Sequence, residues 1–344
     1  MNVIICYTFN ENIPHYNTTG DYNFTQNVHS VTNNFSFIGI DIYIYLKCIN
    51  VSFEELEKYV SNEIKTITFI NCDTIYHNNI PLTIPIYLYI IDIHGATNMI
   101  NSMSNNELYN VISPYAYCYN SFNYKIPNNI YFLPHCVAHK CKFNTNPKIK
   151  ILISGRGRKN YKIYPMKHKF YNLHILNTRT EYLKTDHPYR IHDKKRFDTI
   201  TCGQNYINKL NEYLICFCDD LCNDRPYIVC KFFEILSSGS LLLASNNNTR
   251  SYFKELGFID GEDYISINND NIQSKINFVI DPLNLQLINK IRKSGYDKCN
   301  KFHNCNERLT QLMNIIDQMN IIDQTNTLHL HISNNGTEYY SHYK

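Results

Sequence analysis

The stretch KFFEILSSGSLLLASN, residues 231–246, joins a helix-like segment to a strand-like one. Its first half has apolar residues at helical spacing, and Gly239 stands where a helix commonly ends. The run SLLLAS that follows is almost continuously apolar, which is typical of a strand covered on both faces. The stretch therefore predicts one helix–strand unit of an α/β fold.

The polar side chains of the expected helix allow two interpretations. Lys231, Glu234 and Ser238 fall on one helical face, away from the apolar residues. One interpretation is a solvent-exposed Lys–Glu pair, worth about 0.3 kcal/mol. The other is a ligand site, because a helix that leads into a parallel strand begins on the side where α/β sheets bind ligands. Asn223 or Asp224 is expected to cap this helix, with a proline in its first turn.

Alternating strand-like and helix-like segments also fill the first half of the chain. Expected strands lie at 37–48, 66–70, 84–93, 116–121 and 129–135, and expected helices at 52–64 and 105–113. Near-continuous apolar strands between helices predict a mostly parallel sheet that is covered on both faces.

A polar segment with two prolines, residues 134–148, interrupts the alternation and predicts a domain boundary. Beyond it we expect strands at 148–157, 174–177 and 213–218, and helices at 165–173, 207–212, 250–258, 271–280, 282–299 and 306–324. The predicted organisation is an N-terminal domain over 1–140, a C-terminal domain over 146–300, a C-terminal helix over 301–324 that crosses back, and a polar tail over 325–344.

Length and composition suit two globular α/β domains. The chain has 344 residues, 44% hydrophobic and 18% charged, and no apolar run approaches the ~20 residues that span a bilayer. Its N-terminus lacks the basic region of a secretory signal, so we expect a cytoplasmic location and 13 reduced cysteines. A net charge of +3 is too weak to indicate nucleic-acid binding.

Three stretches carry a resemblance to a known family: FFEILSSGSLLLAS, YFKELGFIDGEDYISINND and HNCNERLTQL. The residues that match are Glu234, Gly239, Gly257, Gly261, Glu262, Asp263, Tyr264, His303 and Arg308. In this order they resemble the C-terminal domain of GT-B glycosyltransferases of the "glycosyl transferases group 1" type, particularly the spore-maturation-protein-like branch. The resemblance implies two Rossmann-like parallel-sheet domains that face a cleft.

The resemblance also implies a nucleotide-sugar donor site in the C-terminal domain. Glu234 matches a carboxylate that accepts hydrogen bonds from the ribose hydroxyls, and Gly239 belongs to the same motif. Lys231 is expected to contact phosphate or to pair with Glu234 until the nucleotide binds. The stretch ILISGRGRKNYKIYP matches the strand and basic turn that bind the donor pyrophosphate, with Arg156 and Lys159 as its cations. A solvated positive turn is the competing interpretation of this segment.

The implied reaction is metal-independent transfer of a sugar from a nucleotide-sugar to the hydroxyl of a glycan, protein or small-molecule acceptor, without a further cofactor. Asp92 and His94, just after a buried strand, are the candidate catalytic residues on the acceptor side. Retaining relatives carry an acidic residue where this chain has Pro226, and the stereochemistry of transfer stays open. A Gly-rich loop after the first strand is also missing, so an inactive sugar- or nucleotide-binding protein of the same fold is the alternative.

Other constellations in the chain point to metals or nucleic acids more weakly. Metal-ligand residue types occur as two groups, His135, Cys136, His139 and Cys141, and Cys216, Cys218 and Cys222. Neither group has zinc-finger spacing. Asp219 and Asp220 mimic the acidic pair with which the other large glycosyltransferase fold binds a metal, but they lie too late in the chain. Tyr, Lys and Arg around 156–171 suit stacking on bases, although no recognised nucleic-acid motif accompanies them.

Overall fold

A computed structural model gives the architecture of the protein. It describes residues 2–8, 41–47, 64–70, 86–89, 109–115, 129–137, 141–155, 164–172, 180–184, 203–220, 227–245, 249–304, 307–308, 310–311 and 314–315. These residues fall into two compact units, one within 1–135 and 308–320 and the other within 136–307. No helix among them has the length and apolar character needed to span a bilayer.

The first unit is built on a parallel sheet with the strand order β2-β1-β3-β4-β5-β6. Its strands are β1 (Asn2–Thr8), β2 (Asp41–Lys47), β3 (Ile64–Ile70), β4 (Ile86–Tyr89), β5 (Tyr109–Ser113) and β6 (Asn129–Phe132). The prediction of parallel pairing is confirmed. The helices expected at 52–64 and the strand expected at 116–121 lie outside the described residues.

The helix expected over 105–113 is wrong, because residues 109–113 form strand β5. This strand pairs with β4 on one side and β6 on the other, and Val111 and Ile112 are fully buried. In a segment this short, pairing on both edges and burial of β-branched side chains outweigh helix propensity.

The second unit contains a parallel sheet with the order β11-β10-β9-β7-β8. Its strands are β7 (Lys148–Gly155), β8 (Thr180–Lys184), β9 (Tyr213–Asp219), β10 (Leu241–Ser245) and β11 (Ile265–Ser266). Strand β8 falls in a segment that the sequence interpretation assigned to a polar loop, and that assignment is wrong. Among the described strands β8 lies at the edge of the sheet, where residues need not be apolar.

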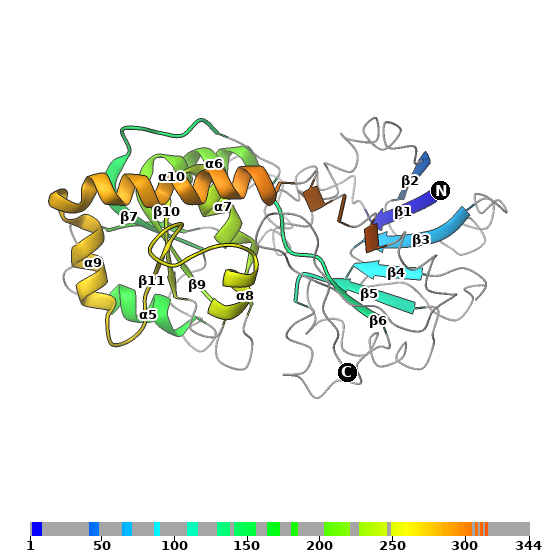
Figure 1. The fold of residues 1–344 in the computed structure, drawn as a ribbon, viewed down its shortest axis with the longest axis horizontal. Helices are drawn as coiled ribbons and strands as arrows, with labels where there is room; N and C mark the ends of the chain where they lie inside the picture. The colour runs from blue at the N-terminus through cyan, green and yellow to red at the C-terminus, as the bar shows by residue number, and fades with distance from the viewer. Residues whose placement is uncertain are drawn as a thin grey trace. The chain divides into compact units, whose positions relative to one another are not determined.

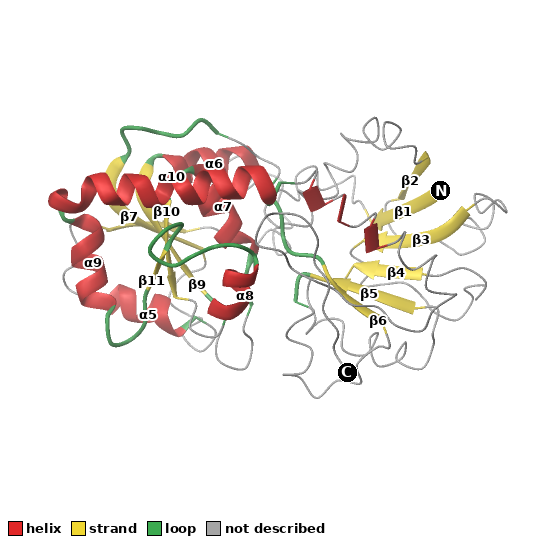
Figure 2. Ribbon diagram, viewed as in Figure 1, coloured by secondary structure: helices red, strands yellow, loops and turns green. Residues whose placement is uncertain are grey.

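Helices cover both faces of this second sheet (Figures 1 and 2). They are α5 (Pro165–Asn172), α6 (Gly203–Asn211), α7 (Cys230–Ser238), α8 (Arg250–Glu255), α9 (Ile272–Ile280) and α10 (Leu285–Phe302), with a short 3-10 turn η7 (Pro282–Asn284) before α10. The helices predicted from the sequence over 165–173, 207–212, 250–258, 271–280 and 282–299 are confirmed in kind, with shifted ends.

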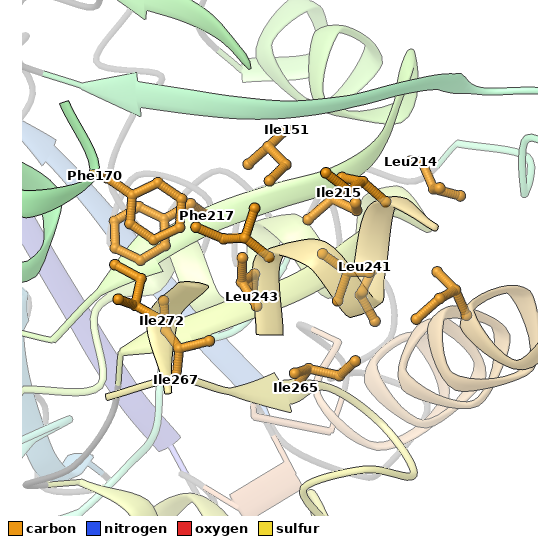
Figure 3. Packing of buried hydrophobic residues seen from close by; sticks show 14 of the residues in the cluster. Ile151, Phe170, Leu214, Ile215, Phe217, Leu241, Leu243, Ile265, Ile267 and Ile272 are labelled. Atoms are coloured by element: carbon orange, nitrogen blue, oxygen red, sulfur yellow. The ribbon is translucent and has the colours of Figure 1, made fainter. Parts of the chain in front are cut away.

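Alternate residues of the strands pack into one continuous core on the face that α5 and α9 cover (Figure 3). Phe170 of α5 stacks on Phe217 of β9 with 4.2 Å between ring centroids. Ile272 of α9 joins the same cluster beside Leu243 of β10. The aromatic stack and the aliphatic cluster fix α5 against the carboxyl-terminal half of β9.

Helix α7 ends where the sequence predicts but begins later. Gly239 adopts φ 81° and closes the helix as a left-handed C-cap, as expected. The expected cap at Asn223 or Asp224 is wrong, because Val229 is the N-cap residue and no side chain of the described residues caps this end.

The order of the second sheet creates a switch point between β7 and β9. From β7 the chain moves outward to β8, and it then returns past β7 to form β9 on the other side. In doubly wound sheets of this order, ligands bind outside the carboxyl ends of the two strands that flank the switch point. Here those ends are Gly155 and Asp219.

Candidate functional site

Two lysine side chains converge on the carboxyl end of β7. Lys167 of α5 and Lys231 of α7 each donate a hydrogen bond from Nζ to the carbonyl oxygen of Ser154, and both N···O distances are 3.1 Å. We call Ser154, Gly155, Lys167 and Lys231 the two-lysine turn. It brings together side chains that lie more than 60 residues apart in the sequence, at the switch point of the sheet.

Gly155 leaves room for both ammonium groups. A Cβ atom at this position would lie 2.8 Å from Nζ of Lys167 and 3.1 Å from Nζ of Lys231. The backbone of Gly155 also has φ 119°, a conformation that side-chain-bearing residues rarely adopt. The backbone conformation therefore favours glycine, and the lack of a Cβ leaves room for the flexible ends of the two lysines.

The environment of Lys167 disfavours its positive charge. Burial and, to a smaller extent, the nearby charge of Lys231 lower the pKa of Lys167 to about 7, while Cys218 and Asp219 act in the opposite direction. The ring of Tyr164 lies 5.8 Å from Nζ. A bound anion would add the opposite effect and restore the charge.

Asp219 holds the start of α5 from across the sheet. Its Oδ2 atom accepts a hydrogen bond of 2.9 Å from the amide of Lys167, the third residue of the helix. Burial raises the pKa of Asp219 to about 7, against hydrogen bonds from the amides of Lys167 and Met166 and from the Ser245 side chain. Asp219 thus acts as the N-cap that α5 lacks in its own sequence.

Glu234 lies in the second turn of α7 and is only 5% exposed. Burial raises the pKa of its carboxyl group to about 7, and the charge of Lys231 opposes this increase. Within the part of the chain that the structure describes, no donor reaches the Glu234 carboxylate. The interpretation as a solvent-exposed ion pair is wrong, because residues 232–238 of the helix are all buried.

Tyr206 of α6 connects Glu234 to the two-lysine turn. Its hydroxyl group is 2.7 Å from Oγ of Ser154. Burial raises the pKa of Tyr206 well above its usual value, and the negative charge of Glu234 is the next cause. Tyr206 and Ser154 therefore form a polar contact at the carboxyl end of β7, and Glu234 lies close enough for its charge to act on the Tyr206 hydroxyl group.

Gly239 lies at the other end of α7 from Lys231. Its carbonyl oxygen accepts a hydrogen bond of 2.7 Å from Nε of the fully buried Arg292. A Cβ atom on Gly239 would approach the ring of Phe143 to 3.0 Å. The structure thus separates Gly239 from the two-lysine turn and gives it the contacts of a helix end.

The residues of the family resemblance that follow Gly239 in the chain make hydrogen bonds and packing contacts within the protein. His303 is buried, with Nε2 3.0 Å from the carbonyl oxygen of Leu256, and its ring stacks on Phe258. Asp263 accepts hydrogen bonds from Ser294 and Lys298 of α10. Arg308, in the first unit, donates from Nε to the carbonyl oxygen of Pro134 at 2.9 Å.

Four predicted site residues, Arg156, Lys159, Asp92 and His94, lie outside the described residues. Lys167, Asp219 and Tyr206 lie at the site and were missed from the sequence. A Lys at a helix start and a Tyr within an amphipathic helix look like ordinary surface residues. Asp219 alone carried a signal, since it follows an apolar strand.

The residues behind the competing metal interpretations make other contacts in the structure. Asp219 caps α5, and Oδ2 of Asp220 is 3.4 Å from the Thr249 hydroxyl group. Burial raises the pKa of Cys216 and of Cys218 to about 12, which favours thiols over metal-binding thiolates. The residues that the structure describes contain no group of three or more His, Cys, Asp or Glu that could hold a metal ion.

Comparison with known proteins gives matches in structure only. No protein-family profile matches the chain, and no curated protein matches its sequence. A glycosyltransferase from Rickettsia africae is similar, with a TM-score of 0.54 and 11% identity over 95% of this chain and 99% of that chain. An α-glucosyltransferase in complex with UDP-glucose and DNA containing an abasic site has a TM-score of 0.58 and 10% identity over 92% and 99%.

HepE from Anabaena, in complex with UDP-glucose, is also similar, with a TM-score of 0.52 and 8% identity over 92% of this chain and all of that one. These proteins are glycosyltransferases, and two of the structures contain UDP-glucose. The predicted fold is confirmed: this chain is an α/β protein with the GT-B fold of the group 1 glycosyltransferases.

Proposed function

We propose that this protein is a glycosyltransferase that moves a sugar from a nucleotide-sugar donor to an acceptor hydroxyl. One observation carries the proposal. Glu234 is only 5% exposed, no donor among the described residues reaches its carboxylate, and its charge acts on Tyr206, which contacts Ser154 at the switch point of the sheet. A carboxylate without donors is costly to bury unless a ligand supplies them, and ribose offers two adjacent hydroxyl groups.

The donor would be held by groups of opposite character. Glu234 would accept hydrogen bonds from the ribose hydroxyls, while Lys231 of the two-lysine turn would contact the diphosphate. Arg156 and Lys159, which follow β7 in the sequence, are proposed as further cations. Gly239 would act indirectly, because it ends α7 and so fixes the position of the Glu234 backbone.

Transfer would proceed without a metal ion. Negative charge develops on the leaving nucleoside diphosphate as the glycosidic bond breaks, and fixed ammonium groups can stabilise this charge in place of a cation. On the acceptor side, Asp92 or His94 would take the proton of the attacking hydroxyl. The expected acceptor is a glycan, protein or small molecule, in a cytoplasmic setting.

Calorimetric titration with UDP- and GDP-sugars tests the donor site. We expect Glu234→Ala to weaken binding by about 1–3 kcal/mol, because two hydrogen bonds to a buried carboxylate would be lost. Glu255→Ala, at an exposed position of α8, is the matched control and should leave binding unchanged. If the wild-type protein binds no nucleotide-sugar, both the enzyme and the inactive-binder interpretations fail.

Product analysis separates an enzyme from an inactive binder. A glycosyltransferase should hydrolyse its donor slowly or transfer the sugar to an acceptor, whereas a binder of the same fold would do neither. Turnover should persist in EDTA, and its loss would contradict metal-independent transfer. The acceptor panel should include duplex DNA, where transfer would contradict the predicted absence of a nucleic-acid partner.

A further inference from the structure

The edge of the second sheet where its strands begin carries exposed apolar side chains. Leu283 of η7 is 90% exposed, and Leu287 of α10 and Ile149 of β7 are 45% and 49% exposed. Exposed hydrophobic residues are usually scattered singly over a protein surface. Here three of the four large ones among the described residues lie at one edge, and we call them the amino-edge patch.

Hydrogen bonds of α10 fix this placement. Arg292 donates to the carbonyl oxygens of Gly239, just before β10, and of Asn144, just before β7. The first half of α10 therefore lies at the edge where β7 and β10 begin, on the outside of the second unit (Figures 1 and 2). The candidate donor site is at the opposite edge, where β7 and β9 end, so the amino-edge patch is not part of it.

Local hydrogen bonds hold Leu283 in its exposed position. Oδ1 of Asp281 accepts a hydrogen bond of 2.9 Å from the amide of Leu283, and Nδ2 of Asn284 donates to the carbonyl oxygen of Phe278 at 3.0 Å. Pro282 restricts the backbone of the same turn. An apolar side chain that an ordered turn holds in water can enter an apolar phase with little further ordering of the backbone.

Lysine side chains surround the amino-edge patch. Lys142 and Lys290 are exposed, and neither forms an ion pair with a described residue. The other lysines have carboxylate partners in surface pairs of the kind that contribute little to stability. Lysines outnumber carboxylates at this edge, with Lys142, Lys148, Lys150, Lys209, Lys290 and Lys293 against Glu181, Glu212, Asp281 and Asp297.

Apolar side chains within a basic surface fit a membrane that contains anionic lipids. Three separate side chains offer much less contact area than the ~800 Å² that each partner of a stable protein interface buries. A membrane needs no continuous apolar surface, because each leucine enters the acyl region by itself and each lysine is attracted to anionic headgroups. Lysine also keeps its ammonium group in water while its methylene chain contacts lipid.

We propose that the amino edge of the second unit binds reversibly to a membrane surface rich in anionic lipids. Leu283, Leu287 and Ile149 enter the outer part of the bilayer, and Lys142 and Lys290 contact the headgroups. The proposal adds a lipid surface to the expected partners, and it does not depend on the proposed glycosyltransferase activity.

Sedimentation of the full chain with vesicles tests the electrostatic part. The protein should bind vesicles of phosphatidylcholine with about one-third phosphatidylserine and should not bind vesicles of phosphatidylcholine alone. Lys142→Ala and Lys290→Ala should each weaken binding about fivefold. Lys254→Ala, at an exposed position of α8, is the matched control and should have no effect. No binding to either kind of vesicle, or equal binding to both, would overturn the proposal.

Tryptophan fluorescence tests insertion directly, since the chain contains no tryptophan. The single indole of Leu283→Trp should emit at shorter wavelength, and become protected from a water-soluble quencher, when phosphatidylserine vesicles are added. Ile259→Trp is the matched control. Ile259 is also exposed, but it follows Gly257, whose carbonyl oxygen accepts a hydrogen bond from Lys298 in the second half of α10. Unshifted emission from vesicle-bound Leu283→Trp protein would contradict insertion at this edge.

A second copy of the chain is the alternative occupant of the amino-edge patch. Leu283→Ser should weaken vesicle binding about tenfold and leave nucleotide-sugar binding unchanged, because the donor site is at the opposite edge. If Leu283→Ser instead abolishes a concentration-dependent dimer in analytical ultracentrifugation and leaves vesicle binding unchanged, the membrane proposal fails. Circular dichroism of each variant confirms that it is folded.

Discussion

The two ends of α7 differ in how their polar groups are satisfied. At the carboxyl end, the carbonyl oxygens of Ser238 and Gly239 accept hydrogen bonds from Asn211 and Arg292, at 2.5 and 2.7 Å. At the amino end, no side chain of the described residues caps the helix, and none of them donates to the carboxylate of Glu234 in the second turn. The polar groups of the carboxyl end are thus paired within the protein, whereas the Glu234 carboxylate at the amino end can still accept hydrogen bonds from a ligand.

The difference indicates that the carboxyl end of α7 contributes to stability and that the amino end is the candidate for ligand binding. Buried polar groups are normally paired, and unpaired ones cost free energy. The carboxyl end follows this rule through hydrogen bonds from Asn211 of α6 and Arg292 of α10, and Arg292 also donates to the carbonyl oxygen of Asn144. The amino end departs from it where the sheet order already predicts a ligand site, so the two ends should respond to mutation in opposite ways.

Arg292→Ala should have the largest effect, and on stability alone. The guanidinium group donates to Gly239, Asn144 and Asn289 and is fully buried. Its loss leaves buried carbonyl oxygens unpaired and a cavity, so the free energy of unfolding should fall by about 3–5 kcal/mol. Urea denaturation measures the change. Lys290→Ala, exposed on the same helix, should change stability by less than about 0.5 kcal/mol.

Glu234→Gln should act in the opposite direction on stability. The pKa of this carboxyl is raised from 4.5 to about 7 by burial, so the folded protein holds the extra proton between these pH values. Stability of the wild type therefore falls as pH rises through this window, and the neutral amide removes the loss. At pH 8 the variant should be more stable by up to about 3 kcal/mol, yet bind nucleotide-sugars more weakly. Equal pH dependence of unfolding in both proteins would contradict this.

Gly239→Ala should weaken only the carboxyl end of α7. The residue has φ 81°, and a Cβ atom would approach Phe143 to 3.0 Å. Together these should lower the free energy of unfolding by about 1–2 kcal/mol. Gly257→Ala is a useful control, because it shares a positive φ of 87° but has no atom within 4 Å of the added Cβ. A smaller loss in the control isolates the contribution of Phe143.

Val229→Asp should have the smallest effect on stability. It tests the amino end of α7 most directly, because it changes both the capping of the helix and the charge beside Lys231. A carboxylate at the N-cap would accept a hydrogen bond from the uncapped first turn of α7 and stabilise the protein by about 0.5–1 kcal/mol. The same negative charge beside Lys231 should weaken pyrophosphate binding. Thermal unfolding and calorimetry together check the two signs, and a gain in both would refute the assignment of this end to an anion.

Several parts of the fold followed from the sequence because their signals are local. The apolar runs of β7, β9 and β10 predict buried parallel strands, and Gly239 predicts the end of α7. Strands β5 and β8 were missed, since a short strand is defined by the neighbours that pair with it. Their side chains alone carry too little periodicity to identify them.

The candidate site shows the same division. Glu234 and Lys231 were found through their motif and both lie near the carboxyl end of β7. Lys167 and Asp219 have no motif, and their roles depend on a contact between α5 and the ends of two strands. The sequence could not reveal that contact, because it is created by the crossover that places β9 beside β7.

By itself, the sequence determined the class of the fold, the end of a helix at Gly239 and the choice of the Glu234 carboxylate as a site residue. Hydrophobic periodicity and glycine conformation are properties of short segments, and they persist whatever the rest of the chain does. Only the tertiary structure decided that Glu234 is buried, with no donor to its carboxylate among the described residues, and that two lysines from different helices meet at Ser154. Burial and charge proximity are properties of packing, and packing is set by the whole sheet.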